Sequence, residues 1–223
     1  MQGYDVAPLV VSDDKCNITD LLVDRAAKTP SLALFSVAGQ DGKWTDITAQ
    51  TFLESVVALA KGLVASGIAP GQAVAIMSRT RYEWTLIDFA IWFAGAVSVP
   101  IYESSSPAQM QWILSDSDSV AVFLENGEHF ERFEEIQEST PLVQHIWRMD
   151  EDDIATLQTR GKDISDDVIE QRRKAVKLHD LARDQTQARC IAFGAVVEHH
   201  LHAHTHAKQR LFVSGIHDRI EHA

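Results

Sequence analysis

Apolar residues recur with two different spacings along the chain, and the spacing predicts where helices and strands lie. Over residues 52–64, apolar side chains stand three or four positions apart, which is typical of a helix with one buried face, and Gly67 is placed to end that helix. Residues 32–37 and 43–48 are short extended segments joined by a glycine-containing turn. They predict a small hairpin ahead of the helix.

Four short apolar runs follow, and helical patterns alternate with them. Each run is bounded by turn residues and is short enough to be a buried strand. The runs are residues 73–78, 96–102, 119–125 and 142–149. Strands that alternate with helices indicate a parallel sheet whose faces are covered by helices. We therefore predict an α/β fold with a mostly parallel sheet and helices on both faces.

The first helix between these strands is predicted over residues 82–95, where apolar side chains dominate. Thr80 and Glu83 have the spacing of a capping box, so we expect them to form its start. Gly95 is expected to end it.

The other two helices have a cap and a buried face that can be named. Ser106 is the expected cap of the second helix, and Pro107 stands at its first position, where a missing N–H costs nothing. The third helix, after the third strand, places Phe130, Phe133 and Ile136 on one face.

Ligands of parallel sheets bind beyond the carboxyl ends of the strands, so the loops there hold the candidate chemistry. Arg79 and Arg81, after the first strand, could hold an anion, but surface arginines more often pair with nearby acids or face solvent, and we favour that interpretation. Ser104, Ser105 and Ser106 lie at a helix N-terminus, which attracts anions. Capping already explains Ser106.

A run of acidic residues, Met149–Asp153, is a candidate site for a divalent cation. The spacing of a calcium loop is missing from it. We therefore interpret this run as a solvated acidic loop.

Composition restricts the class of partner. The net charge of −12 argues against a nucleic-acid-binding protein, and the 45% hydrophobic content allows a substantial core. With only Cys16 and Cys190, the chain has neither a disulfide framework nor a Cys-x-x-Cys pair, which fits a reducing cytoplasm.

The longest apolar run, residues 89–102, is shorter than the ~20 residues that span a bilayer. We expect a cytoplasmic protein without a transmembrane segment; peripheral contact with the inner membrane stays open.

The composition changes abruptly near residue 182. Residues 182–223 hold 4 acidic and 5 basic residues and seven of the ten histidines. Five of these histidines crowd together, at His199, His200, His202, His204 and His206. On a strand, alternate members of this cluster would share one face, which is one way to bind a metal ion.

Three stretches carry a resemblance to a known family. They read GLVASGIAPGQAVAIMS (62–78), AGAVSVPIYESSS (94–106) and QWILSDSDSVAVF (111–123). Together they resemble the N-terminal portion of adenylate-forming, AMP-binding enzymes, and most closely the bacterial long-chain fatty-acid–CoA ligases. The similarity runs from about Asn17 to Ala182.

This resemblance implies an activity. Such enzymes use ATP and Mg²⁺ to convert a fatty acid to an acyl-adenylate, release pyrophosphate, and then transfer the acyl group to the thiol of coenzyme A. Their nucleotide phosphates lie against a Ser/Thr/Gly-rich loop that ends in Pro-Lys-Gly, and a C-terminal domain supplies a further lysine. Fatty acid, ATP and coenzyme A are therefore the implied ligands.

The chain departs from this pattern after residues 177–182, which resemble the lead-in to the strand that delivers the phosphate loop. Residues 183–223 contain no such loop and leave no room for the later elements of the family. We therefore expect a form truncated before the phosphate-binding loop and inactive by itself. No catalytic, cofactor-binding or metal-binding residue is assigned.

Two domains are expected on these grounds. Residues 1–182 are an incomplete AMP-binding domain, and residues 183–223 are an irregular His-rich tail outside the family, for which a frameshift near residue 182 is the favoured origin. An incomplete sheet predicts self-association of the fragment. A non-enzymatic interaction module and a metal-binding tail remain alternative functions.

Overall fold

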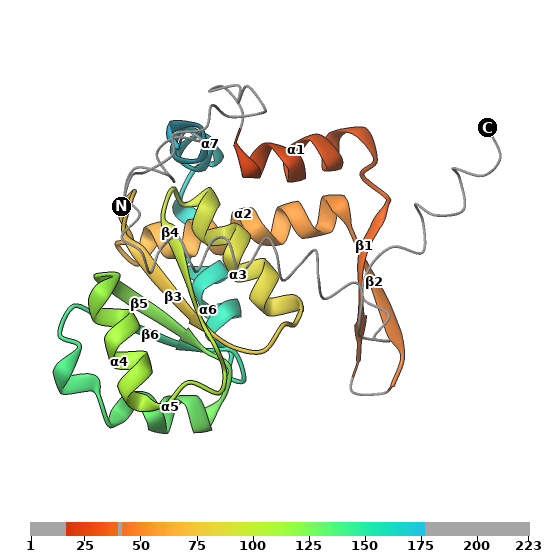
Figure 1. Cartoon of the computed structure of the whole chain (residues 1–223). Coiled ribbons are helices and arrows are strands. Elements are labelled where there is room, and N and C mark those ends of the chain that lie inside the picture. The colour runs from red at the N-terminus through yellow and green to blue at the C-terminus, as the bar shows by residue number, and fades with distance from the viewer. Residues whose placement is uncertain (1–16, 40–41, 177–223) are drawn as a thin grey trace, which may run out of the picture.

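The computed structural model describes residues 17–39 and 42–176 (Figure 1). Its strands are β1 (Ala33–Ala38), β2 (Trp44–Thr48), β3 (Ala73–Met77), β4 (Val97–Ile101), β5 (Ser119–Leu124) and β6 (His145–Arg148). Its α-helices are α1 (Ile18–Lys28), α2 (Ala49–Ala65), α3 (Tyr82–Phe93), α4 (Pro107–Asp116), α5 (Gly127–Glu134), α6 (Asp153–Arg160) and α7 (Asp166–Ala175). Two short 3₁₀ turns, Gln137–Ser139 and Gly161–Asp163, follow α5 and α6. The expected boundary at residue 182 and the histidine cluster lie outside the described residues.

Four strands form a parallel sheet in the order β4-β3-β5-β6. Each of them coincides with a predicted apolar run, so the predicted α/β sheet is confirmed. Strands of this kind read as continuous apolar runs because both of their faces are buried. All five residues of β3, for example, are buried.

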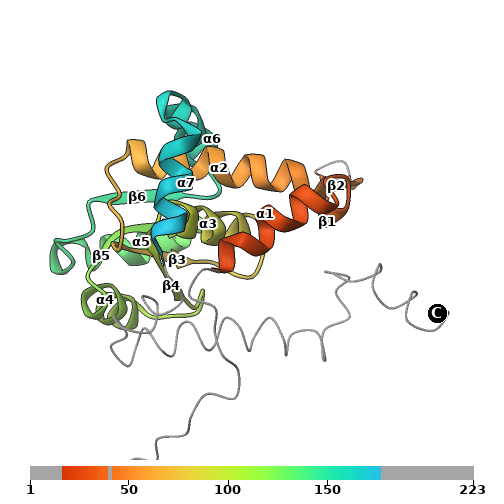
Figure 2. The same cartoon turned by 90° about the horizontal axis from the view of Figure 1, so that it is seen from above.

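The two faces of the sheet are covered by different helices (Figure 2). Val74 and Ile76 of β3 belong to a large cluster with side chains of α2, α3, α6 and α7. Ala75 and Met77, which point the other way, belong to a second cluster with α4 and α5. The prediction of helices on both faces is confirmed.

β1 and β2 form the predicted hairpin, which lies apart from the parallel sheet (Figure 1). Its strands are antiparallel, and the Ser36 hydroxyl donates to Asp46 Oδ1 at 2.6 Å. Trp44, the first residue of β2, is 65% exposed. A two-stranded ribbon has little core of its own, so its inner residues, such as Phe35, pack on α2 and α3 through Phe52 and Tyr82.

Helix ends agree with the predicted signals at the start of α4 and at the ends of α2 and α3, where Gly95 follows α3 with a φ of +74°. α4 begins with the predicted cap, Ser106, whose Oγ accepts from the Gln109 N–H; the Gln109 side chain accepts from the Ser106 N–H and completes a capping box. The chain leaves α2 through Gly67, whose φ of +92° lies in the left-handed region.

The predicted capping box of α3 is wrong. The cap of this helix is Arg81, which makes no side-chain capping hydrogen bond. Glu83 is engaged elsewhere, because its Oε2 accepts from Arg81 Nε at 2.6 Å. Strong pairing with an arginine side chain replaces the weaker bond to a backbone amide.

α2 approaches α6, and the 3₁₀ turn after α6, more closely than side chains on the facing residues would allow. A Cβ on Gly62 would lie 2.2 Å from the carbonyl oxygen of Leu157, and one on Gly161 would lie 2.5 Å from the Gly62 nitrogen. Glycine at both positions is therefore a packing requirement. No helix in the described ranges is long and apolar enough to cross a membrane.

Candidate functional site at the carboxyl edge of the sheet

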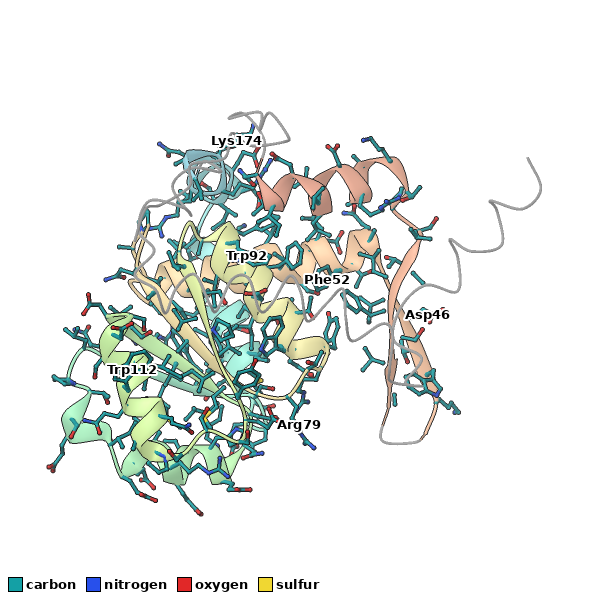
Figure 3. All side chains as sticks on the ribbon, viewed as in Figure 1. Asp46, Phe52, Arg79, Trp92, Trp112 and Lys174 are labelled. Atoms are coloured by element: carbon teal, nitrogen blue, oxygen red, sulfur yellow. The ribbon has the colours of Figure 1, made fainter. Side chains whose placement is uncertain are left out.

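The four parallel strands end at one edge of the sheet, and the loops that follow them form the candidate site. Arg79 lies at this edge (Figure 3). A backbone hydrogen bond connects the ends of β3 and β5, because the Glu125 N–H donates to the Met77 carbonyl at 3.0 Å. Topology therefore brings side chains from distant parts of the sequence to one place.

Glu125 is the buried centre of this edge, with 3% of its surface exposed. Its Oε2 accepts from the Arg79 backbone N–H at 2.8 Å, and its Oε1 accepts from Arg79 Nη2 at 2.9 Å. Burial by itself would raise the pKa of Glu125, but the hydrogen bonds and charge of Arg79 outweigh it and hold the pKa below the ordinary value. The carboxylate is therefore ionised and fixes the loop after β3.

Arg81 completes the same network. Its Nε donates to Glu83, and its Nη1 lies 3.7 Å from Glu125 Oε1. The favoured interpretation of Arg79 and Arg81 as partners of nearby acids is confirmed. The sequence could not name Glu125 as the partner, because 46 residues separate it from Arg79.

The serine loop after β4 is held by α5. Nη1 of Arg132 donates to the carbonyl of Glu103 at 2.7 Å and to that of Ser105 at 3.3 Å. Ser105 is buried, and Ser106 caps α4 as predicted, whereas Ser104 is exposed. Two of the three serines therefore have structural roles at this edge.

The acidic run after β6 is exposed at Asp150, Glu151 and Asp152, as predicted for a solvated loop, and it also pairs with an arginine. Arg148 binds both carboxylate oxygens of Asp150, at 3.0 and 2.9 Å, and lies 3.2 Å from Glu151. The Asp153 carboxylate accepts from the Arg148 N–H at 2.7 Å and begins α6. The hydrogen bond from Arg148 lowers the pKa of Asp150. The interpretation from sequence considered the acidic residues alone. It left out Arg148, which precedes them as the last residue of β6.

Asp150 also ties this loop to α5, since its Oδ2 accepts from the Gly127 N–H at 3.1 Å. A carboxylate at the start of a helix is favourable because the unpaired N–H groups there carry partial positive charge. Over the described ranges, no group of three or more His, Cys, Asp and Glu side chains is placed to hold a metal ion.

One buried acid away from this edge was not predicted. Asp88 of α3 is 4% exposed, and burial raises the pKa of its carboxyl to about 7, with the Ser98 hydroxyl of β4 acting in the opposite direction. An isolated acid among the apolar residues of α3 is the sequence signal that could have identified it.

A second buried charge joins the two ends of the described chain. Arg173 of α7 is 4% exposed; its Nη1 donates to Asp20 at 2.6 Å, and its Nε and Nη2 donate to Glu170 at 2.5 and 2.7 Å. Its carbonyl accepts from the Asn17 side chain at 2.9 Å. We call this group of four residues the Arg173 clamp.

The comparisons with known proteins agree with this architecture. A family model described as AMP-binding enzyme matches residues 22–185. The chain is 36% identical over 140 residues to the long-chain-fatty-acid–CoA ligase FadD15 of Mycobacterium tuberculosis, a match that covers 63% of this chain and 23% of the relative. It is 36% identical over 66 residues to the peroxisomal long chain acyl-CoA synthetase 6 of Arabidopsis thaliana, which covers 30% and 9%.

Solved structures share the fold. A fatty acyl CoA synthetase of Mycobacterium tuberculosis has a TM-score of 0.57 at 25% identity, over 66% of this chain and 29% of that one. The long-chain-fatty-acid–CoA ligase FadD1 of Archaeoglobus fulgidus has a TM-score of 0.59 at 17% identity, over 71% and 33%. The chain thus spans about a quarter of the FadD15 relative and about a third of these structures.

Proposed function

The chain belongs to the AMP-binding enzyme family, and we propose that it is the N-terminal part of a long-chain fatty-acid–CoA ligase. The 36% identity to FadD15 carries this proposal. The reaction would join a fatty acid to AMP with release of pyrophosphate and then transfer the acyl group to coenzyme A. Adenylation supplies the leaving group that a carboxylate lacks.

In this proposal the described residues form a scaffold. Each arginine discussed at the carboxyl edge already binds a carboxylate or a carbonyl, as the contacts of Arg79, Arg81, Arg132 and Arg148 indicate. A nucleoside triphosphate needs cationic side chains or backbone amides that are free to bind its phosphates. These arginines are already paired, so they do not fit that role. ATP, Mg²⁺ and coenzyme A would therefore bind mainly to parts of the family that this sequence does not contain.

We propose, further, that the family domain ends near residue 182 and that residues 183–223 are read out of frame. The abrupt change in charge and histidine content supports this. The check is the gene sequence: a shift of frame near codon 182 should restore a Thr/Gly-rich loop with a lysine. A gene without such a loop in any frame would refute the frameshift and leave the family assignment intact.

Activity is tested with palmitate, ATP, Mg²⁺ and coenzyme A in a coupled assay for pyrophosphate. We expect no turnover from the 223-residue chain. We expect turnover from a chimera in which residues 17–182 replace the matching part of FadD15. The control is the same chimera with Gly62→Leu, which cannot pack α2 against α6 and should be inactive. An inactive chimera that folds and binds ATP would count against the proposed ligase function.

A further inference from the structure

Asparagine is chemically labile where glycine follows it, and the chain has one such pair. It contains two asparagines, Asn17 and Asn126. Asn17 is followed by Ile18, whose branched side chain shields the backbone nitrogen. Asn126 is followed by Gly127, which has no side chain, and both residues are partly exposed at the start of α5. The Asn126–Gly127 pair therefore has the sequence and the access to water that deamidation requires.

Deamidation proceeds through a five-membered ring. The Gly127 nitrogen attacks Cγ of Asn126, a C–N bond forms, and the side-chain nitrogen leaves as ammonia with the proton that Gly127 gives up. Water then opens the cyclic imide at either carbonyl, which gives aspartate or isoaspartate at position 126. The ring closes only when the attacking nitrogen and Cγ reach contact in the correct orientation.

The hydrogen bonds at the start of α5 hold these two atoms out of that orientation. Oδ1 of Asn126 accepts from the His129 N–H at 3.1 Å, and its carbonyl accepts from the Phe130 N–H at 3.1 Å. The Gly127 N–H donates to Asp150 Oδ2 at 3.1 Å. With ψ of Asn126 at 178°, the Gly127 nitrogen is staggered relative to Cβ. Ring closure needs it nearly eclipsed with Cβ, so the rotation must break these bonds.

Asp150 is the contact that controls the Gly127 nitrogen. Its carboxylate accepts from Arg148 Nε and Nη2 at 3.0 and 2.9 Å, which fixes it beside the start of α5. A carboxylate on this N–H opposes loss of the proton, because the amide anion would lie beside a second negative charge. We propose that Asn126 is a deamidation site and that Asp150 restrains the reaction while α5 is packed on the sheet.

The two products differ in their effect on α5. Aspartate caps a helix about as well as asparagine, and its charge suits the positive end of the helix. Isoaspartate inserts a further carbon into the main chain and displaces the cap. α5 carries Arg132, which donates to the carbonyls of Glu103 and Ser105 at the carboxyl edge. Isoaspartate at position 126 should therefore loosen the serine loop after β4.

Peptide mapping by mass spectrometry tests the proposal on the full chain, kept at neutral pH and physiological temperature. Because the reaction needs a local opening, conversion at Asn126 should be at least tenfold slower in the folded chain than in denaturant, with Asn17 unconverted in both. Gly127→Ala, whose Cβ would lie 3.5 Å from Arg148 Nη2 in ordinary contact, should fold and suppress the reaction. Equal rates in the folded and denatured chain, or conversion of Asn17 as fast as that of Asn126, would overturn the proposal.

Substitution of Asp150 tests the restraint itself. Asp150→Ala removes the acceptor of the Gly127 N–H and should speed conversion in the folded chain about fivefold, as expected for the loss of one hydrogen bond. The matched control is Asp152→Ala, because Asp152 is exposed in the same acidic run and makes no side-chain capping hydrogen bond; it should not change the rate. Asp150→Asn keeps an acceptor oxygen without the charge, so it should lie between them, and it replaces Asp150→Ala if that variant does not fold. Equal rates for the Asp150 and Asp152 variants would refute the restraint.

Hydrogen exchange separates the two products. The Ser105 N–H donates to the Tyr102 carbonyl at 3.0 Å, within the loop that Arg132 holds. Its exchange should be about threefold faster in a chain aged to isoaspartate. Asn126→Asp, which contains the aspartate product alone, should leave this exchange unchanged. Equal exchange in the two forms would contradict the loosening of the serine loop.

Discussion

The carboxyl edge and the Arg173 clamp each contain a charged group that is buried and paired with more exposed groups of opposite charge. At the edge the buried group is an acid, and in the clamp it is an arginine. At the edge, Glu125 is buried while the side chain of Arg79 is 70% exposed. In the clamp, the side chain of Arg173 is 5% exposed while those of Asp20 and Glu170 are 34% and 44% exposed. A buried charge that loses its partner cannot be rehydrated, whereas an exposed one can. Removal of the exposed partner should therefore cost more than removal of the buried one.

The largest effect is expected in the clamp. Asp20→Asn with Glu170→Gln leaves the Arg173 guanidinium buried without a counter-charge, and should lower the free energy of unfolding by about 3–5 kcal/mol. Arg173→Met, which removes the buried charge and keeps an apolar stem beside Phe93, should cost clearly less. Chemical denaturation of the full chain measures both. A larger loss for Arg173→Met would reverse the comparison.

A buried carboxyl without a guanidinium partner sharpens the comparison through pH. The pKa of Asp88 is raised to about 7, so its contribution to stability is complete below its ordinary value near 4 and is lost as the pH rises to about 7. This loss is on the order of 4 kcal/mol. Asp88→Asn should flatten that part of the profile of unfolding free energy against pH. A profile unchanged by the substitution would show that Asp88 is not the group responsible.

At the carboxyl edge, Arg79→Ala should destabilise the protein more than Glu125→Gln does. The first leaves Glu125 buried without its main partner, while the second leaves an exposed arginine that water can solvate. Thermal melts of the two variants decide the order. Equal shifts in Tm would mean that burial of the carboxylate has no special cost.

The smallest effect is that of Glu125→Gln, about 1 kcal/mol, because the amide oxygen can still accept a hydrogen bond. This variant should also lose part of the acid sensitivity of the native chain. The pKa of Glu125 is lowered, so its contribution is present above the ordinary glutamate range and is lost as the pH falls through the folded value. The slope of unfolding free energy against pH below this range measures it.

The sequence predicted those parts of the fold whose signal is local. Both strands of the hairpin and all four parallel strands were found, because apolar runs between turn residues identify buried strands. α1, α6 and α7 were not recognised, although Asn17 and Asp20 of α1 form a capping box in the structure. These helices are rich in charge, and only packing decides which of their faces is buried.

The site could be predicted less completely, for a physical reason. The sequence by itself determined the sheet and its covered faces, and it favoured Arg79 and Arg81 as arginines that are solvated or paired with acids. Only the tertiary structure decided that the partner of Arg79 is Glu125 and that Arg173 holds Asp20 across 153 positions. Parallel strands bring residues far apart in the chain together, so the partner of Arg79 follows from strand order. The partner of Arg173 follows from the position of α7 beside α1. No local pattern contains either.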